Sequence, residues 1–316
     1  MTRTQKTWDW YFHQGYSGES LGALRALFGI GLFFYHFTQF AHVIILDPAG
    51  PSAQFMDQIW YFEILGVTQN VPWLNIPVFI LLLISTLFFA LGKWTKPAII
   101  VLVLCIFYLK GVRDSFAGDV HHRYIVPVIM MFLFFCSKCH YHFAFDAKKH
   151  ADKNVAEWEA SWPIRVAQTY IVLFYFWAMV AKLRVTGWTW FEPAGQIQAK
   201  LIQRSIRSGF TETGELVRRA HSFEIAEYVW LIFIFGALVS VFELLAPVIL
   251  FIRKRWMLIL FLLGAFCFHI ANYILLNVQF YFYPIVFLVF FDMAWFAVWW
   301  SKRRDRKLDP ENLALK

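Results

Sequence analysis

A lysine and an arginine stand at the end of a long apolar run and are the first candidates for chemistry. Lys182 and Arg184 close a run that begins near Pro163. A primary amine can act as a general base when it is neutral, and burial or a neighbouring cation favours the neutral form. Both side chains could instead extend from a helix end toward lipid headgroups. Their role therefore depends on the other polar residues that share their side of a membrane.

Imidazole, amide and guanidinium groups occur in or beside two further apolar runs. One run is preceded by His121, His122 and Arg123, and another contains His269 and Asn272. Ionisable side chains within a bilayer are costly, so those that persist are candidates for function. Both groups also have a structural interpretation. His269 can be a core histidine that donates to a backbone carbonyl, and the residues from His121 to Arg123 can belong to an ordinary polar loop.

These residues are set in a very apolar chain. Of its 316 residues, 59% are hydrophobic and 16% are charged, whereas soluble domains have about 45–50% and about 25%. Several runs approach or exceed the length that spans a bilayer. We expect an all-α polytopic integral membrane protein, with a single domain over 1–316 and a core at about 21–300. The net charge of +8 is explained by basic cytoplasmic loops, so no nucleic-acid partner is expected.

Eight transmembrane helices are expected, at about 21–46, 73–91, 97–108, 124–139, 163–182, 223–251, 256–276 and 280–300. Basic clusters follow the second, fourth, sixth and eighth helices, so the positive-inside rule places both termini in the cytoplasm. The loop at 185–222 conflicts with this orientation, because it carries Lys and Arg residues on the outer side. In this topology all seven candidate residues share the outer leaflet, whereas Arg25 and Glu243 lie nearer the cytoplasmic end and are not expected to be catalytic.

The loop at 185–222 contains an amphipathic pattern. Isoleucine and leucine recur near helical spacing at Ile197, Leu201, Ile202 and Ile206, with polar and basic residues between them. The pattern predicts a basic helix that lies in the membrane interface. A solvated surface helix is the alternative.

A cysteine pair with nearby histidines follows the fourth run. The spacing of Cys136, Cys139 and His140 is that of a haem-attachment site, and such residues can also bind zinc. The expected topology places them in the cytoplasm, where covalent haem attachment does not occur. We therefore expect small apolar cysteines at a helix end and no metal site.

Four motifs in order resemble the horizontally transferred transmembrane (HTTM) family, which includes the membrane domain of vitamin K-dependent γ-glutamyl carboxylase. The segment around Lys182 is similar to the lysine segment of that family, which has a Lys-Lys-Leu sequence shortly before a tryptophan. The Phe-His-Ile-Ala-Asn sequence ending at Asn272 resembles a family Phe-His-x-x-Asn motif. The residues from His121 to Tyr124 lie where the family has Asn-His-Ser-Tyr, and Glu243 begins an acidic-Leu-Leu motif.

The resemblance implies a mechanism. Lys182 would deprotonate reduced vitamin K or menaquinol, and oxygen would convert the anion into an alkoxide base and finally an epoxide. In a carboxylase, that base would allow a substrate carbanion to capture CO2. His122, His269 and Asn272 match family positions and would hold the quinol oxygens or the developing charge, and Arg184, His121 and Arg123 would lie beside them.

The chain also departs from the family pattern. Ala181 replaces the first lysine, Arg123 replaces a serine, and the sequence ends where the carboxylase continues into a lumenal domain. Quinol-dependent oxygenation or carboxylation-type chemistry in the bacterial inner membrane is therefore the expected function, with lipid, quinol and an exported peptide as expected partners. A non-catalytic membrane partner, for maturation of or immunity to a secreted peptide, is the alternative. A transporter is less expected, because no internal repeat is visible.

Overall fold

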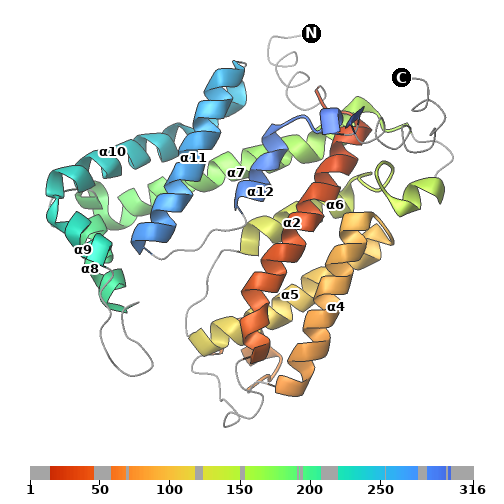
Figure 1. Cartoon of the computed structure of the whole chain (residues 1–316), viewed down its shortest axis with the longest axis horizontal. Coiled ribbons are helices and arrows are strands. Elements are labelled where there is room, and N and C mark those ends of the chain that lie inside the picture. The colour runs from red at the N-terminus through yellow and green to blue at the C-terminus, as the bar shows by residue number, and fades with distance from the viewer. Residues whose placement is uncertain are drawn as a thin grey trace, which may run out of the picture. The chain divides into compact units, whose positions relative to one another are not determined.

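The protein is described by a computed structural model, which covers residues 15–45, 58–68, 71–117, 124–149, 154–190, 192, 195–207, 220–252, 254–276, 283–296 and 298–299. Every regular element in these ranges is a helix (Figure 1). Six of the described helices are long and apolar enough to cross a membrane. They are α2 (Gly18–Ile45), α4 (Pro72–Leu91), α5 (Thr95–Ala117), α7 (Glu157–Thr186), α10 (Val229–Leu245, continued by η4, Ala246–Phe251) and α11 (Arg255–Leu276). The predicted all-α, multi-pass membrane protein is confirmed at this level.

The predicted count of eight spans is not confirmed. The fourth expected span is α6 (Ile125–Cys136), which has 12 residues and is shorter than a bilayer-spanning helix. The eighth expected span is broken: its described part contains α12 (Tyr283–Val286), η5 (Phe287–Phe290) and further helical residues at 294–296 and 298–299. Apolar composition alone predicted both spans, and composition does not distinguish a continuous helix from a broken one.

The chain divides into two compact units. One consists of residues 1–167 together with 285–316, and the other consists of residues 168–284. Helix α7 begins in the first unit and ends in the second, so the predicted single domain over 1–316 stays a prediction. The two units are described separately below.

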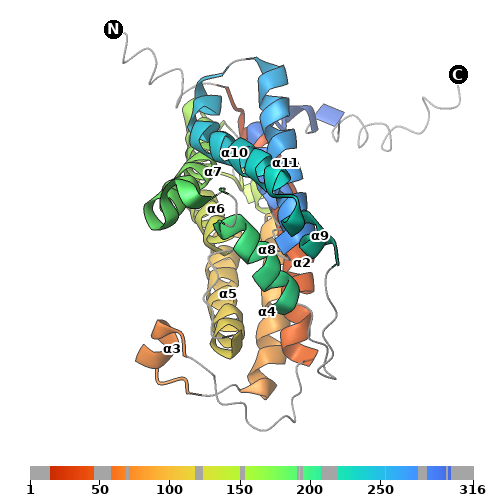
Figure 2. The ribbon, with the colours of Figure 1, turned by 90° about the vertical axis from the view of Figure 1, so that its left-hand side faces the viewer.

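In the first unit, α2 packs on α4 and α4 packs on α5 (Figure 2). Arg25 of α2 is fully buried and donates to the carbonyl oxygens of Phe89 and Ala90 at 2.5 and 2.9 Å, and to that of Phe143 at 2.5 Å. The last carbonyls of a helix lack intrahelical partners and attract cations. Arg25 therefore fixes the C-terminal end of α4, which agrees with a role in pinning the bundle.

The turn after α4 is shaped for this close approach. Gly92 has φ 66°, a left-handed conformation that favours glycine. A Cβ atom at Gly92 would collide with Ala144 and would lie 2.8 Å from a guanidinium nitrogen of Arg25. A glycine is thus required where α4 ends against Arg25.

Asp146 binds the backbone at the start of α5, directly after the same turn. It lies in the short helix η2 (Phe145–Lys149), and its carboxylate is 2.9 Å from the Lys149 ammonium. Burial raises the pKa of the Asp146 carboxyl, but hydrogen bonds from Lys149 and from the backbone N–H groups of Trp94 and Thr95 outweigh burial and hold the pKa below its usual range. Asp146 therefore caps the N-terminus of α5 as a carboxylate.

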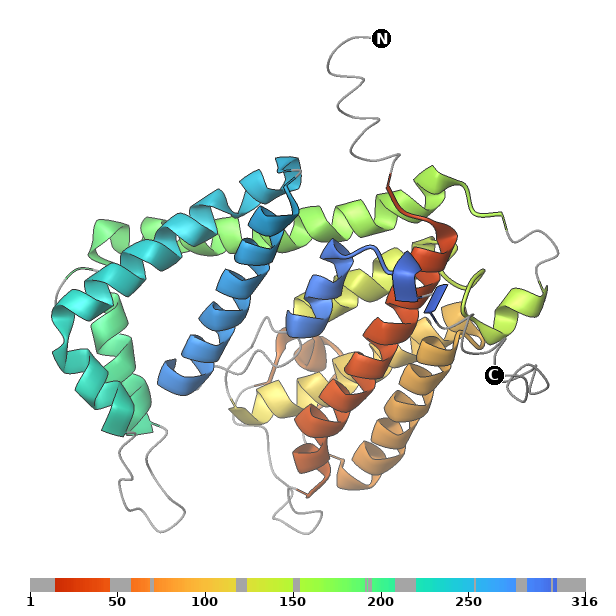
Figure 3. The ribbon, with the colours of Figure 1, turned by 45° about the horizontal axis from the view of Figure 1, so that its top comes forward.

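The second unit contains the C-terminal part of α7, the helices η3 (Gly187–Trp190), α8 (Gln196–Arg207) and α9 (Ala220–Glu227), and then α10, η4 and α11 (Figure 3). The predicted amphipathic helix is confirmed as α8. Its Leu201 is 2% exposed and packs with Ala226 of α9 and Ile232 of α10. Part of the apolar face of α8 is thus covered by its own unit, and its location in the membrane interface stays a prediction.

We predict that Asp146→Ala lowers the free energy of unfolding by about 1 kcal/mol, the usual contribution of a helix N-cap. Because the folded pKa is lowered, the stability from the charge is present above the unfolded pKa, about 4. It is lost as the pH falls through the lower folded pKa. Asp146→Asn keeps a hydrogen-bond acceptor but removes the charge. It should therefore lose the pH-dependent part of the stabilisation, and it should lose less of the pH-independent part than Asp146→Ala. Thermal unfolding in detergent at several pH values measures both, and unchanged stability in both variants would contradict the cap.

Candidate functional site

The end of α7 and the turn after it position Lys182. The Thr186 hydroxyl donates to the carbonyl oxygen of Lys182 at 2.8 Å and holds the last turn of the helix. Gly187 then adopts φ 59°, a left-handed conformation that ends helices. The chain reverses into η3, and the indole ring of Trp190 comes to lie 5.2 Å from the Lys182 Nζ atom. Lys182 is thereby held between its own helix and a returning aromatic side chain.

Lys182 forms an ion pair with Glu243 of α10. The Nζ atom donates to both carboxylate oxygens of Glu243, at 2.7 and 2.6 Å. The Glu243 side chain is 2% exposed and the Lys182 side chain is 21% exposed. The expected separation of Glu243, nearer the cytoplasmic end, from Lys182 is wrong, because the two residues are in contact.

A second polar pair lies in the same unit. The hydroxyl of Tyr175 on α7 and the Nε2 atom of His269 on α11 are 2.6 Å apart, and both residues are buried. Tyr175 precedes Lys182 by seven residues, which is two helical turns and the same face of α7. Sequence reasoning selected His269 but missed Tyr175, because one tyrosine among many aromatic residues gives no distinct signal.

Aromatic rings connect the two pairs. The ring of Phe242, which precedes Glu243, is 5.5 Å from that of Tyr175 and stacks on Phe261 at 5.1 Å. The ring of Phe268, which precedes His269, is 6.2 Å from that of Tyr175 and 6.0 Å from the Lys182 Nζ atom. Such surroundings lower the local dielectric constant and strengthen the interaction of buried charges. The ion pair and the Tyr175–His269 pair therefore belong to one apolar cluster.

The other predicted site residues are placed less favourably or fall outside the description. Asn272 is half-buried on α11, three residues after His269, and Arg184 is exposed on α7. His121, His122 and Arg123 lie outside the described residues. The structure thus brings together Lys182 and His269 with Glu243 and Tyr175, and it does not bring Arg184 to them.

The cysteine pair gives no sign of a metal centre. No group of three or more potential metal ligands occurs among the described residues. Cys136 is exposed, whereas Cys139 is buried and its Sγ atom is 3.3 Å from the carbonyl oxygen of Phe134. Burial raises the pKa of the Cys139 thiol, so the thiolate that binds metal is disfavoured.

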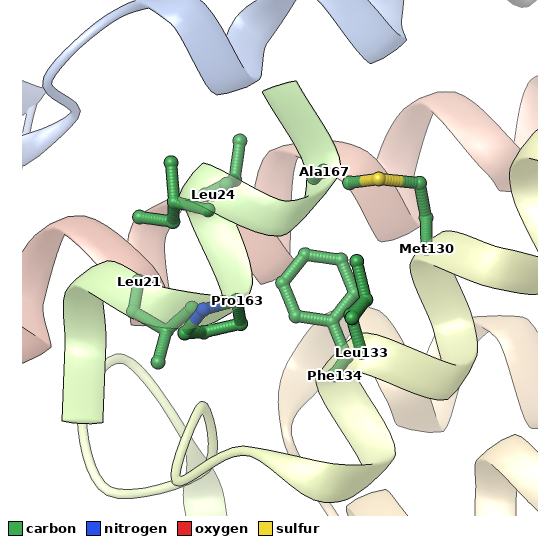
Figure 4. Close-up of a pocket in the computed structure, with 8 residues that line it drawn as sticks. Leu21, Leu24, Met130, Leu133, Phe134, Pro163 and Ala167 are labelled. Carbon is green, nitrogen blue, oxygen red and sulfur yellow. The ribbon is translucent and has the colours of Figure 1, made fainter. Parts of the chain in front are cut away.

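A small apolar cavity lies in the first unit, away from these polar residues in the sequence. It has room for about one water molecule and is lined by side chains of α2, α6 and α7 (Figure 4). Its lining residues, Leu21, Leu24, Met130, Leu133, Phe134, Pro163, Ile164 and Ala167, carry no polar side-chain group. The cavity is too small for a ligand ring, and its side chains cannot contribute acid–base chemistry.

The chain matches no protein-family model, no curated protein and no solved structure. The resemblance to the HTTM family therefore rests on the sequence motifs alone. The functional argument depends on the residues and their geometry.

The Lys182–Glu243 pair offers two protonation sites in direct contact, so a proton can move from one to the other without changing the net charge of the pair. When the amine is protonated and the carboxyl group is deprotonated, the pair has no net charge. A proton taken from a ligand can be stored on Glu243, while Lys182, the more exposed of the two, passes it on. A buried pair of this kind is a candidate for general acid–base chemistry.

We predict that Lys182→Met destabilises the fold by about 3–5 kcal/mol, because it leaves a buried carboxylate without its cation. Glu243→Gln should cost less, since water can reach the partly exposed Lys182 ammonium. The double variant Lys182→Met/Glu243→Gln should be more stable than the two single effects would give if they were additive. Denaturant unfolding of the four proteins measures the coupling, and strictly additive effects would show that the two side chains do not interact.

Proposed function

We propose that the protein is a multi-pass membrane enzyme of the vitamin K γ-carboxylase type, which uses a reduced quinone such as reduced vitamin K or menaquinol. Its membership of the HTTM family, eight spans, cytoplasmic termini and a bacterial inner-membrane location are parts of this proposal. The observation that carries it is the buried ion pair of Lys182 with Glu243 at the end of an apolar helix. A lysine that only ends a helix would need no buried carboxylate as a partner, because its side chain could extend to the lipid headgroups.

The base in this proposal is the pair and not Lys182 alone. A lysine that donates to a carboxylate at 2.6 Å carries its proton, so it must lose one before it can accept another. Glu243 takes that proton, and Lys182 then accepts the proton of a bound hydroxyl group. The net result is one proton moved from the ligand to Glu243, with the developing negative charge beside a lysine ammonium.

The residue types around the pair are those that a quinol site requires, which supports the proposal. A flat aromatic headgroup needs apolar walls and a few polar groups that fix its oxygens. Phe242 and Phe268 supply apolar rings next to the pair, and His269 supplies an imidazole whose orientation is fixed by the short contact with Tyr175. A quinol bound there would supply electrons for the reduction of O2, and CO2 would be a further substrate if the reaction is a carboxylation.

His269 and Tyr175 would act together. The Tyr175 hydroxyl and the His269 Nε2 atom share one hydrogen bond at 2.6 Å, so the imidazole cannot rotate without breaking it. Asn272, on the same helix, is half-buried and adds an amide within one turn of His269. In the proposal His269 is the catalytic partner of Lys182, Tyr175 is its positioning residue, and Asn272 binds a quinol oxygen.

We predict that Lys182→Ala lowers the turnover of reduced menaquinone or vitamin K by about 10²–10⁴-fold, the usual contribution of general acid–base catalysis. Glu243→Gln should have an effect of similar size, because Lys182 then has no acceptor for its proton. The assay follows oxygen-dependent consumption of the quinol by chromatography, with the full chain in detergent or nanodiscs.

The control is Lys254→Ala, which removes an exposed lysine at the start of α11 in the same unit. It should retain the activity of the parent protein. Activity that survives Lys182→Ala in a folded protein would remove the proposed base. Activity lost only in Lys182→Ala and retained in Glu243→Gln would assign the base to the lysine alone.

A further inference from the structure

A second lysine shares the aromatic ring that lies over Lys182. The Nζ atom of Lys200, on α8, is 5.5 Å from the ring centroid of Trp190, and that of Lys182 is 5.2 Å from the same centroid. Glu243 balances the charge of Lys182. Lys200 forms no ion pair in the described part of the chain, and its charge is left without a carboxylate partner.

The indole of Trp190 adds a hydrogen-bond donor that has no acceptor. Its Nε1 atom is buried and has no partner among the described residues. Buried donors are almost always satisfied, and one that is not needs an explanation, such as a ligand. Two ammonium groups and one unsatisfied N–H group therefore surround a single aromatic ring, and together they call for an acceptor with negative charge.

The place of this cluster at a helix end points to the membrane surface. Trp190 is the last residue of the candidate span Glu157–Trp190, and tryptophan is enriched at the headgroup level of membranes. The next helix, α8, has three basic residues and no acidic residue. Part of its apolar face packs on Ala226 and Ile232, so that part does not insert in the lipid. What α8 offers to the membrane is charge.

We propose that Lys200, Lys182 and the Nε1–H group of Trp190 form a binding site for the phosphate group of an anionic lipid headgroup. A phosphate has several oxygens, so it can accept from both ammonium groups and from the indole at once. A zwitterionic choline headgroup fits less well, because its own cation would lie beside two lysines. Lys200 is one of the basic residues in the loop at 185–222, which conflicts with the positive-inside pattern, and the site gives this residue a partner. Inorganic phosphate has the same chemistry and is the other source to distinguish.

The test uses the full chain in nanodiscs of phosphatidylcholine with phosphatidylglycerol, and native mass spectrometry counts the retained lipid. We expect one phosphatidylglycerol to be retained in preference to phosphatidylcholine. Lys200→Gln should weaken its binding about tenfold, the effect of losing one charge-assisted hydrogen bond. Lys200→Arg should restore it, and Trp190→Phe, which keeps an aromatic ring but removes the N–H group, should weaken it as well.

Lys254→Gln is the matched control, since it removes one exposed positive charge from the same unit. Equal weakening by Lys200→Gln and Lys254→Gln would indicate diffuse attraction and overturn the site.

A parallel titration with inorganic phosphate in a zwitterionic detergent separates the two sources. Binding of inorganic phosphate that depends on Lys200, without any preference for phosphatidylglycerol, would overturn the assignment to lipid. The proposed lipid site shares Lys182 with the proposed base, but none of these variants changes Lys182 or Glu243. Loss of lipid binding with retained quinol turnover, or the reverse, therefore distinguishes the failure of one proposal from that of the other.

Discussion

The buried ion pair between Lys182 and Glu243 is the interaction on which the second unit depends. A carboxylate that is 2% exposed within an apolar helix is strongly unfavourable unless a cation meets it in good geometry. That requirement fixes the end of α7 against α10 at one register. A break in α10 follows closely after Glu243, since α10 ends at Leu245 and Pro247 lies in the first turn of η4. Proline removes a backbone donor, and the helix therefore changes its geometry immediately after the residue that binds the lysine.

The two units bury cations in different ways, and the difference indicates where chemistry can occur. Arg25 in the first unit is satisfied by three backbone carbonyl oxygens. A guanidinium group stays protonated in proteins, so Arg25 can hold a helix end but cannot move a proton. Lys182 meets a carboxylate instead, and both partners can change their protonation state. Only the second arrangement can serve as an acid–base pair, and it lies beside a histidine that is held by Tyr175.

The sequence was informative wherever a pattern depends on neighbours along the chain. Helical spacing predicted α8, and apolar length predicted the six long helices. The position of Lys182 at the end of its apolar run also identified it as a candidate. Partners far apart along the chain could not be predicted in this way. Glu243 was misplaced because the counting of spans assumes one straight helix from end to end of each apolar run. The run at 223–251 instead contains the end of α9, then α10, and then η4 after Leu245.

The central claim is that Lys182 and Glu243 are in direct contact in the membrane. Solid-state NMR on the full chain in lipid, with ¹⁵Nζ-lysine and ¹³Cδ-glutamate, measures this through the dipolar coupling between the two nuclei. Spectra of a Lys182→Arg variant identify the signal of that lysine. We predict a strong coupling that assigns to Lys182 and Glu243, consistent with N–O distances of 2.6 and 2.7 Å. A Lys182 signal without coupling to any glutamate carboxyl carbon would contradict the account.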